Sequence, residues 1–361
     1  MISKRSNPIV YSIFLSLCDI GVLSLHLKAN GTTPCDLTKG RWQMSAKPPL
    51  YDISHVDGEF KCPRSKSDDI TKYAWVPDDC ELPLFNASKM QHIFSRRPIF
   101  MVGDSLVRNT YESLRMLMPT VDNIHFDFDR YLGHRCGAPN EPAAKEQFPI
   151  ERDHDSLGLS GCAVDLDEIS TMGKFGKLLN SSILMLGGGH HFARRGNTYH
   201  YRDRTLEDTG GRINIEAFTI AIELVFRTLE KMAFTGDVIL QTYSPGHFFH
   251  GDWDSHGSCN GQTGPVNNIS EYADLGSASF SDIEAVNSML RSTAKNPDWK
   301  FGVRIFDITA MSWGRADAHP GEVSNDLPGK ITKNDCQHWC LPGVPDVWNQ
   351  ALLHILSDLF A

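Results

Sequence analysis

The sequence predicts an α/β protein with a central parallel sheet. Four short apolar runs have strand character, at residues 98–102, 182–186, 238–243 and 303–308, and helical stretches separate them. This alternation is typical of parallel strands joined by helical crossovers. The chain has 361 residues and a hydrophobic content of 41%, which is enough for one large domain or two small ones with a filled core.

Residues 1–29 are typical of a signal peptide or a signal anchor. Lys4 and Arg5 precede an apolar run over residues 9–27, and this arrangement directs a chain into the secretory pathway. Asp19 interrupts the run, and a central Asp costs about 2.5 to 3.5 kcal/mol on membrane-insertion scales. We therefore expect either a type II membrane protein with a luminal domain or, after cleavage, a secreted protein.

Residues 30–96 contain three cysteines and several prolines, which predicts a loop-rich N-terminal portion, tied by disulfides and packed on a main domain of residues 97–361. The eight cysteines outside the leader allow 105 disulfide connectivities, and their spacings do not choose among them. The alternative, a zinc site, lacks Cys-x-x-Cys pairs, so we predict no metal. These cysteines are Cys35, Cys62, Cys80, Cys136, Cys162, Cys259, Cys336 and Cys340.

Three helices of the main domain carry recognisable signals. Residues 215–229 place apolar side chains on a single stripe, and Ser281 with Glu284 has the register of a capping box. The last helix is predicted to begin near Pro345. Its apolar residues recur at helical spacing, as in a face packed on a core: Trp348, Leu352, Ile355, Leu356 and Leu359.

The charge of the chain excludes some partners. A formal net charge of -9 gives no basic surface for nucleic acid or for anionic membranes. Asn-x-Ser/Thr triplets at Asn30, Asn86, Asn180 and Asn268 are compatible with glycosylation in the secretory pathway. Neutral or weakly charged partners are therefore favoured.

The turn Gly103-Asp104-Ser105 follows the strand at 98–102 and precedes a predicted helix over residues 106–118. A serine hydroxyl is a weak nucleophile, and a turn between a buried strand and a helix exposes it where a base can reach it. The helix N-terminus would also direct N–H groups at a developing oxyanion. The alternative is that Asp104 or Ser105 only caps the helix.

A second group of polar residues, Asp335-Cys336-Gln337-His338, lies just before the last predicted helix. Asp and His three residues apart can face each other. The carboxylate of Asp335 would then orient the imidazole of His338, whose other ring nitrogen takes the proton of Ser105. The alternative is a solvated Asp beside a structural His.

The segments at residues 103–109 and 335–349 together resemble the plant trichome birefringence-like family of polysaccharide O-acetyltransferases. Residues 243–260, with Tyr-Ser-Pro-Gly-His-Phe and Gly-Ser-Cys-Asn, are similar to a third stretch of that family. The N-terminal residues 35–42 and 75–83 match its pattern as well. The resemblance covers nearly the whole chain outside the leader.

The resemblance implies an SGNH-hydrolase-like three-layer α/β/α fold and a luminal domain in the Golgi. It also implies transfer of acetyl groups from a donor to hydroxyls of cell-wall polysaccharides through an acyl-serine. Ser105, Asp335 and His338 match the family's catalytic positions one by one, and Arg108 matches an arginine that would support the oxyanion. The alternative for Arg108 is a salt bridge on the helix surface. No metal or organic cofactor is implied.

The chain departs from the family at residues 186–192, Leu-Gly-Gly-Gly-His-His-Phe. The side-chain donor usual in this block is missing, so the N–H of Gly188 is our candidate for the oxyanion. Two tryptophans of the family are replaced by His191 and Phe192, and we expect His191 at the sugar site. The alternative for the glycine run is a tight strand exit.

Two further candidates lie in the loop after the strand at 238–243. His247 and Trp253 follow the carboxyl end of a predicted parallel strand, where such sheets usually bind ligands. Their rings are expected to contact a sugar, and burial against the sheet is the alternative.

The sequence supports three functions. The first is a polysaccharide O-acetyltransferase, with an acetyl donor and a polysaccharide acceptor as its partners. The second is an acetyl esterase with the same serine chemistry, which differs in whether water reaches the acyl-enzyme. The third is a polysaccharide-binding protein without catalysis, against which the complete Ser-His-Asp set argues.

Overall fold

The structure is a computed structural model that describes residues 35–56, 58–128, 152–154, 160–165, 182–193, 197–207, 209–210, 212–253, 256–267, 280–323 and 333–360. The expected leader at residues 1–29 and the triplets at Asn30, Asn180 and Asn268 lie outside these residues. Cys35–Ala361 form one compact unit. Within the described residues, none of the helices combines the length and the hydropathy needed to cross a membrane.

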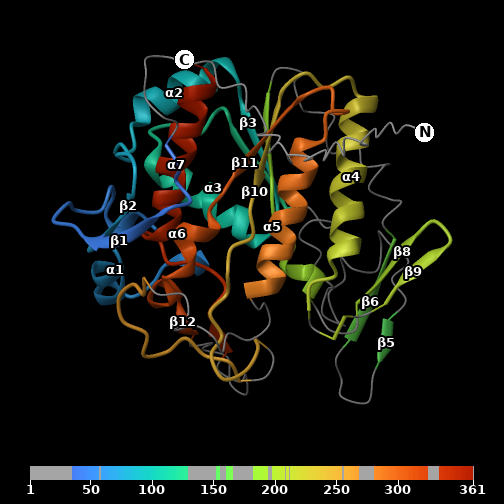
Figure 1. The fold of residues 1–361 in the computed structure, drawn as a ribbon. Helices are drawn as coiled ribbons and strands as arrows, with labels where there is room; N and C mark the ends of the chain where they lie inside the picture. Colours follow the sequence, from blue (N-terminus) through green and yellow to red (C-terminus); the bar gives the residue numbers. More distant parts are fainter. Residues whose placement is uncertain are drawn as a thin grey trace, which may run out of the picture. The chain divides into compact units, whose positions relative to one another are not determined.

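A parallel sheet of five strands forms the centre of this unit, in the order β11-β10-β7-β3-β4 (Figure 1). The four predicted strands are present, and β4 is an additional edge strand whose alternating polar residues hid it from the sequence. The strands are β3 (Ile99–Gly103), β4 (Ile124–Phe128), β7 (Ile183–Leu186), β10 (Asp237–Gln241) and β11 (Gly302–Phe306).

Helices cover both faces of the sheet, because successive buried residues of each strand point to opposite sides. Leu184 and Leu186 of β7 pack in one apolar cluster with α4 (Ile215–Lys231) and α5 (Phe280–Lys295). Ile183 and Met185 pack in the other. That second cluster contains α2 (Ala87–Arg96), α3 (Ser105–Leu117), α6 (Thr309–Trp313) and α7 (Val344–Leu359). The predicted three-layer α/β/α fold is confirmed (Figure 1).

The predicted helices are present with one local difference. The stripe of α4 is buried, and α7 begins at Val344 with Pro345 in its first turn. Helix α5 begins at Phe280, so Ser281 is its second residue, one position inside the start that the sequence predicted.

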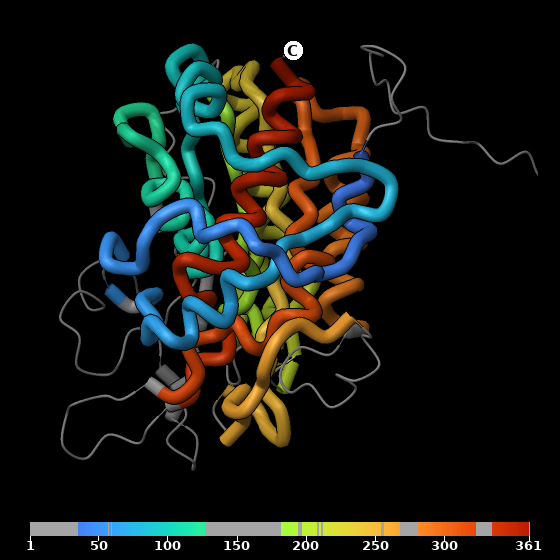
Figure 2. The backbone as a smooth tube through the Cα atoms, turned by 90° about the vertical axis from the view of Figure 1, so that its left-hand side faces the viewer, coloured from blue at the N-terminus to red at the C-terminus, as the bar shows by residue number. Residues whose placement is uncertain are grey.

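The N-terminal portion forms a two-stranded antiparallel sheet of β1 (Gly40–Met44) and β2 (Tyr73–Pro77), with α1 (Arg64–Ile70) between them in sequence. Figure 2 shows this portion passing across the C-terminal helix. The indole of Trp42 donates a hydrogen bond to the carbonyl of Met311, at 3.0 Å. The boundary between residues 96 and 97 stays a prediction.

Three disulfides join described cysteines and select among the connectivities that the sequence left open. Cys35–Cys80 lies within the N-terminal portion, Cys62–Cys340 ties that portion to the segment before α7, and Cys259–Cys336 joins the loop after β10 to the same segment. The segment at residues 335–340 is thus fixed by two covalent bonds.

Two further small sheets are present in the described part of the chain. One is four-stranded in the order β5-β6-β8-β9, and the other pairs β12 with β13. Their bounds are β5 (Arg152–His154), β6 (Ser160–Asp165), β8 (Thr198–Tyr201), β9 (Arg204–Leu206), β12 (Gly321–Val323) and β13 (Lys333–Asp335). Because β13 ends at Asp335, it delivers that carboxylate directly to the edge of the site.

Candidate active site

The turn between β3 and α3 presents Ser105 as the first residue of the helix. A Cβ atom on Gly103 would lie 2.4 Å from the carbonyl oxygen of Gly187, so only glycine allows this approach. Asp104 is the N-cap, and its Oδ1 accepts a hydrogen bond from the main-chain N–H of Leu106 at 2.9 Å. The cap that the sequence offered as an alternative to a nucleophile is therefore made by Asp104, and Ser105 keeps its hydroxyl for other contacts.

Ser105, His338 and Asp335 form one hydrogen-bonded chain. The Oγ of Ser105 lies 2.7 Å from Nε2 of His338, and Nδ1 of His338 lies 2.9 Å from Oδ2 of Asp335. A carboxylate only accepts, so Nδ1 donates to Asp335, and in the neutral ring Nε2 accepts from the serine hydroxyl. This arrangement can remove the proton of Ser105 when its oxygen attacks an acyl carbon.

Asp335 is held as a carboxylate. Burial alone would raise the pKa of Asp335. Its hydrogen bonds together have the larger effect and lower this pKa to about 2; they come from the ring and the main chain of His338 and from the main chain of Gln337. Its Oδ1 accepts both main-chain bonds, at 3.0 and 3.2 Å. The ionised form stabilises an imidazolium on His338 once the ring has taken a proton.

Asn109 positions this segment, a role that the sequence analysis missed. Its Oδ1 accepts from the main-chain N–H of Trp339 at 3.1 Å, and its Nδ2 donates to the carbonyl of Trp339 at 3.1 Å. Asn109 is fully buried on α3, one turn beyond Ser105. The signal available in the sequence was an amide one helical turn after the candidate nucleophile. This pair of bonds fixes His338 relative to Ser105.

The glycine-rich loop after β7 lies beside the nucleophile turn, because Gly187 packs against Gly103. Gly188 and Gly189 have φ angles of 124° and 110°, which other residues rarely adopt. A side chain at Gly189 would meet the ring of Phe218 at 3.1 Å. The expected role of the Gly188 N–H in holding an oxyanion stays a prediction.

His190 follows this loop and contacts Asp104, which the sequence analysis also missed. Its Nδ1 lies 3.2 Å from Oδ2 of Asp104, and its Nε2 lies 2.8 Å from the carbonyl oxygen of Ser244. Its ring stacks on Tyr243 with 3.9 Å between centroids. Burial raises the pKa of Asp104, but the hydrogen bond and the charge of His190 outweigh it and lower that pKa to about 2.

Arg108 lies one turn from Ser105 on α3, and its Nε is 3.6 Å from Oε1 of Glu112. Its guanidinium lies 5.5 Å from the centre of the Phe60 ring, and that ring lies 5.6 Å from the ring of His338. The helix-surface ion pair that the sequence offered as an alternative is therefore present. The expected contact of Arg108 with an oxyanion stays a prediction, and Phe60 is a neighbour of His338 that no local pattern indicated.

The structure corrects the expectation that His247 contacts a sugar, because its side chain is fully buried. Its Nε2 lies 2.7 Å from the carbonyl of Trp313, and its Nδ1 lies 2.6 Å from Nε2 of His319. Burial lowers the pKa of His247 to about 4. Nδ1 of His319 in turn lies 2.6 Å from the carbonyl oxygen of His338, so His247 and His319 together support the segment that carries His338.

The remaining binding candidates stay predictions. Trp253 is exposed, with 43% of its surface accessible, as a stacking ring requires. His191 is half-buried, and its carbonyl accepts hydrogen bonds from Asn197 and Tyr199. Among the described residues, no three His, Cys, Asp or Glu side chains gather in a way that would hold a metal ion.

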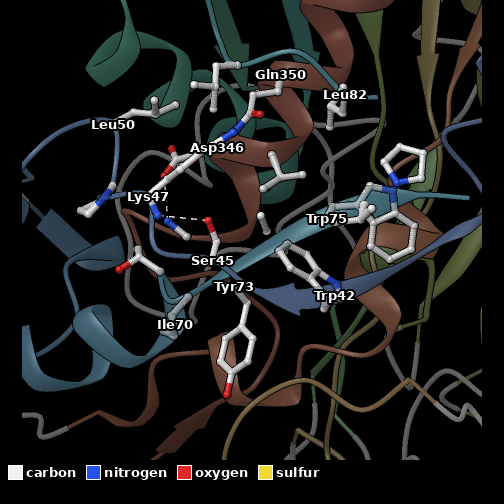
Figure 3. A pocket seen from close by; sticks show the side chains of 18 of the residues that line it. Trp42, Ser45, Lys47, Leu50, Ile70, Tyr73, Trp75, Leu82, Asp346 and Gln350 are labelled. Carbon is white, nitrogen blue, oxygen red and sulfur yellow. Dashed lines mark hydrogen bonds between the residues drawn. The ribbon is translucent and has the colours of Figure 1, made fainter. Parts of the chain in front are cut away.

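A cavity of about 410 Å³ lies away from Ser105, between the two-stranded sheet of β1 and β2 and the start of α7 (Figure 3). Trp42, Tyr73 and Trp75 line it from β1 and β2, and Asp346 and Gln350 line it from α7. Both indoles are at least nine-tenths buried in the core, so they offer little ring face to a ligand.

Known proteins similar to this chain agree with the geometry. The family model of the PC-esterases matches residues 82–355; they are described as a GDSL/SGNH-like acyl-esterase family found in Pmr5 and Cas1p. The chain is similar to three proteins of Arabidopsis thaliana. Protein YLS7 is 26% identical over 91% of this chain and 71% of its own length. Xyloglucan O-acetyltransferase 1 is 27% identical over 89% and 80%, and protein trichome birefringence-like 38 is 28% identical over 91% and 86%.

The resemblance found in the sequence motifs is thereby confirmed, and with it an enzyme class of acyl-esterase or acetyltransferase type. The matched region includes the nucleophile turn, the glycine-rich loop and the Asp335–His338 segment. Since that region covers more than half of the chain, the protein belongs to the PC-esterase family.

Proposed function

We propose that the protein is a polysaccharide O-acetyltransferase that works through an acetyl group on Ser105. The observation that supports this most strongly is the hydrogen-bonded chain from Ser105 through His338 to Asp335. A serine activated in this way forms an acyl-enzyme, which splits one difficult transfer into two easier steps. The relative named xyloglucan O-acetyltransferase supports acetyl as the group and a polysaccharide as the acceptor.

In the first half-reaction, Nε2 of His338 takes the proton of Ser105 while Oγ attacks the carbonyl carbon of the acetyl donor. The oxyanion that forms accepts hydrogen bonds from N–H groups at the start of α3 and from the Gly188 N–H. The bond to the donor's leaving group then breaks, and His338 returns its proton to that group. Asp335 stabilises the imidazolium throughout.

In the second half-reaction, a sugar hydroxyl gives its proton to His338 and attacks the acetyl carbon on Ser105. The bond to Oγ breaks, and His338 protonates the serine. The acetyl group is then an ester of the sugar, and the enzyme is regenerated with all atoms accounted for. We place Trp253 and His191 at the acceptor site and Arg108 beside the oxyanion.

The location belongs to the same proposal. The apolar run at residues 9–27 would anchor the protein in the Golgi membrane with the acetyltransferase in the lumen, or would be removed in a secreted form. The disulfides Cys35–Cys80, Cys62–Cys340 and Cys259–Cys336 support an oxidising compartment.

An acetyl esterase is the second candidate, and the description of the family as acyl-esterases favours it. The first half-reaction is the same in both enzymes. In the second, water replaces the sugar hydroxyl, so the difference lies in how the acceptor site excludes water.

The test is mass spectrometry of wall oligosaccharides incubated with an acetyl donor and the purified protein, wild type beside Ser105→Ala. We expect acetylated oligosaccharide with the wild type and none with the variant. Release of free acetate with unmodified oligosaccharide would contradict the transferase and support the acetyl esterase. Oligosaccharide binding without turnover in either protein would leave a binding protein instead.

A further inference from the structure

His190 joins three segments that the proposed reaction must hold in register. It begins the short helix His190–Ala193, directly after the glycine-rich loop. One ring nitrogen faces Asp104 at the nucleophile turn, and the other faces the carbonyl of Ser244 in the loop after β10. The side chain of Asp104 is fully buried and that of His190 is 12% exposed, so water contributes little to this pair.

Ser244 connects His190 to the segment that carries His338. The hydroxyl of Ser244 accepts a hydrogen bond from the indole N–H of Trp339 at 2.8 Å. Its carbonyl also lies 3.5 Å from Nε2 of Gln337. The residues on both sides of His338 therefore contact the residue that His190 contacts, and His190 links them to the turn that presents Ser105.

The donors and acceptors around the His190 ring fix its protons. A carbonyl oxygen only accepts, so Nε2 must carry a proton to bond Ser244. Oδ1 of Asp104 already accepts from Leu106, and an ionised Oδ2 also only accepts, so Nδ1 must carry a proton too. A neutral imidazole has one N–H, and therefore the ring that satisfies both contacts is an imidazolium.

The proton has one other place, on Asp104, where a carboxylic acid would donate to Nδ1. Two features favour the carboxylate. Asp104 caps α3, where the helix dipole stabilises an anion, and it accepts the Leu106 N–H. The pair carries no net charge in either form, which limits the cost of burying it. The other titratable groups close to it are Tyr243, which stacks on the ring, and His191.

We propose that His190 is a positioning residue for the acyl transfer: as an imidazolium bonded to Asp104 and Ser244, it holds the Ser105 turn, the Gly188 loop and the His338 segment in register. This inference rests on the proposed function. His190 touches neither Ser105 nor His338 in the described contacts, so it acts through their supports. A misplacement of about 1 Å in such a site can cost about 100-fold in rate.

The first experiment compares His190→Phe with the wild type. Phenylalanine keeps an aromatic ring against Tyr243 and removes both donors. We expect kcat, and the rate at which a fluorophosphonate labels Ser105, to fall about 10- to 100-fold with KM changed less than about threefold. A matched control is His354→Phe on α7, where His354 lies 3.8 Å from the exposed Asp358; this variant should behave as the wild type.

The second experiment keeps the bonds and removes the charge. In Asp104→Asn the amide oxygen still caps α3, and the amide N–H₂ donates to Nδ1 of a neutral His190, whose Nε2 still donates to Ser244. We expect labelling within about threefold of the wild type. In ¹⁵N NMR of histidine-labelled protein, His190 should show two protonated ring nitrogens in the wild type and one in this variant.

Two results would overturn the inference alone. They are equal labelling of wild type and His190→Phe, or a neutral His190 ring in wild-type spectra near pH 6. Wild-type protein that is not labelled at Ser105 would instead overturn the proposed function, and this positioning role with it. Should His190→Phe fail to fold, His190→Gln, which retains one donor, is measured in its place with the same expectation.

Discussion

Two Asp–His pairs lie close to the Ser105 turn, and they differ in the group that faces the second ring nitrogen of the histidine. His338 bonds Asp335 through Nδ1 and has the hydroxyl of Ser105 at Nε2. His190 bonds Asp104 through Nδ1 and has a main-chain carbonyl at Nε2. The first pair is about one-quarter exposed, whereas the second is almost entirely buried.

The difference shows that a carboxylate beside a histidine does not by itself make a base. A hydroxyl can give a proton to Nε2, so a neutral His338 ring could accept it in the proposed reaction. A carbonyl has no proton to give, so the His190 ring can only donate. The partner of Nε2 therefore distinguishes the two histidines. A hydroxyl there allows the ring to exchange a proton, whereas a carbonyl leaves it a structural role. No sequence pattern shows which partner is present.

The largest effect should come from removing the base. His338→Ala is expected to lower kcat by about 10⁴- to 10⁶-fold with a much smaller change in KM, because Ser105 loses its proton acceptor. Steady-state kinetics with an acetyl ester would measure this. Activity within 100-fold of the wild type would show that another group acts as the base.

The same Asp-to-Asn change should have opposite results in the two pairs. In Asp335→Asn the amide donates to Nδ1, which leaves the proton on Nε2 facing Ser105, and kcat should fall by about 10⁴-fold. In Asp104→Asn the same tautomer points its N–H at Ser244, where a donor is needed. The ratio of the two kcat values is therefore the measurement, and similar losses in both variants would contradict the comparison.

Acid should destabilise the protein through both carboxylates. The pKa values of Asp104 and Asp335 are lowered to about 2 in the folded state, so their stabilisation is present above pH about 4 and is lost as pH falls toward 2. Each contributes on the order of 2 kcal/mol to the free energy of unfolding. Urea unfolding at a series of pH values would measure this, and the slope should be smaller in Asp104→Asn.

Asp346 provides a control of opposite sign for that measurement. Burial raises its pKa to about 6, although hydrogen bonds from Ser113, the main chain of Gly343 and Tyr51 oppose the shift. Its contribution is therefore full below pH about 4 and is lost as pH rises through 6. If Asp346→Asn left the slope between pH 4 and 6 unchanged, this account of the pH dependence would be wrong.

The smallest effect concerns Phe60, whose ring lies beside His338. Phe60→Leu removes a ring that packs between Arg108 and His338, and aromatic contacts of this kind contribute about 0.5 to 1.5 kcal/mol. We expect kcat to fall about 2- to 10-fold. Phe234→Leu, in the opposite apolar cluster, should lower the melting temperature without lowering kcat, and equal kcat losses in the two variants would remove any special role for Phe60.

Local patterns predicted much of the fold and of the candidate site. The strands at residues 98–102 and 182–186 are apolar runs between turn signals, and the Ser105 turn follows from the strand and helix that flank it. Asp335 and His338 lie three residues apart, so a local argument could pair them.

What the sequence could not supply depends on distant contacts. His190 and Asp104 are 86 residues apart, and His190 resembles its neighbour His191 in every local respect. His247 is expected to contact a sugar because it follows a strand, with burial as the alternative, and its contacts with Trp313 and His319 bury it. The disulfide pairing stayed open for the same reason, since the Cys62–Cys340 bond spans 278 residues.

The most direct test of the central claim is to trap the acyl-enzyme. The protein would be mixed with an acetyl donor in the absence of acceptor, quenched in acid and digested, and the peptide that contains Ser105 examined by mass spectrometry. We predict an acetyl group on Ser105 in the wild type and no acetyl group on this peptide in Ser105→Ala. Acetyl found on another residue, or transfer that continues in Ser105→Ala, would contradict the account.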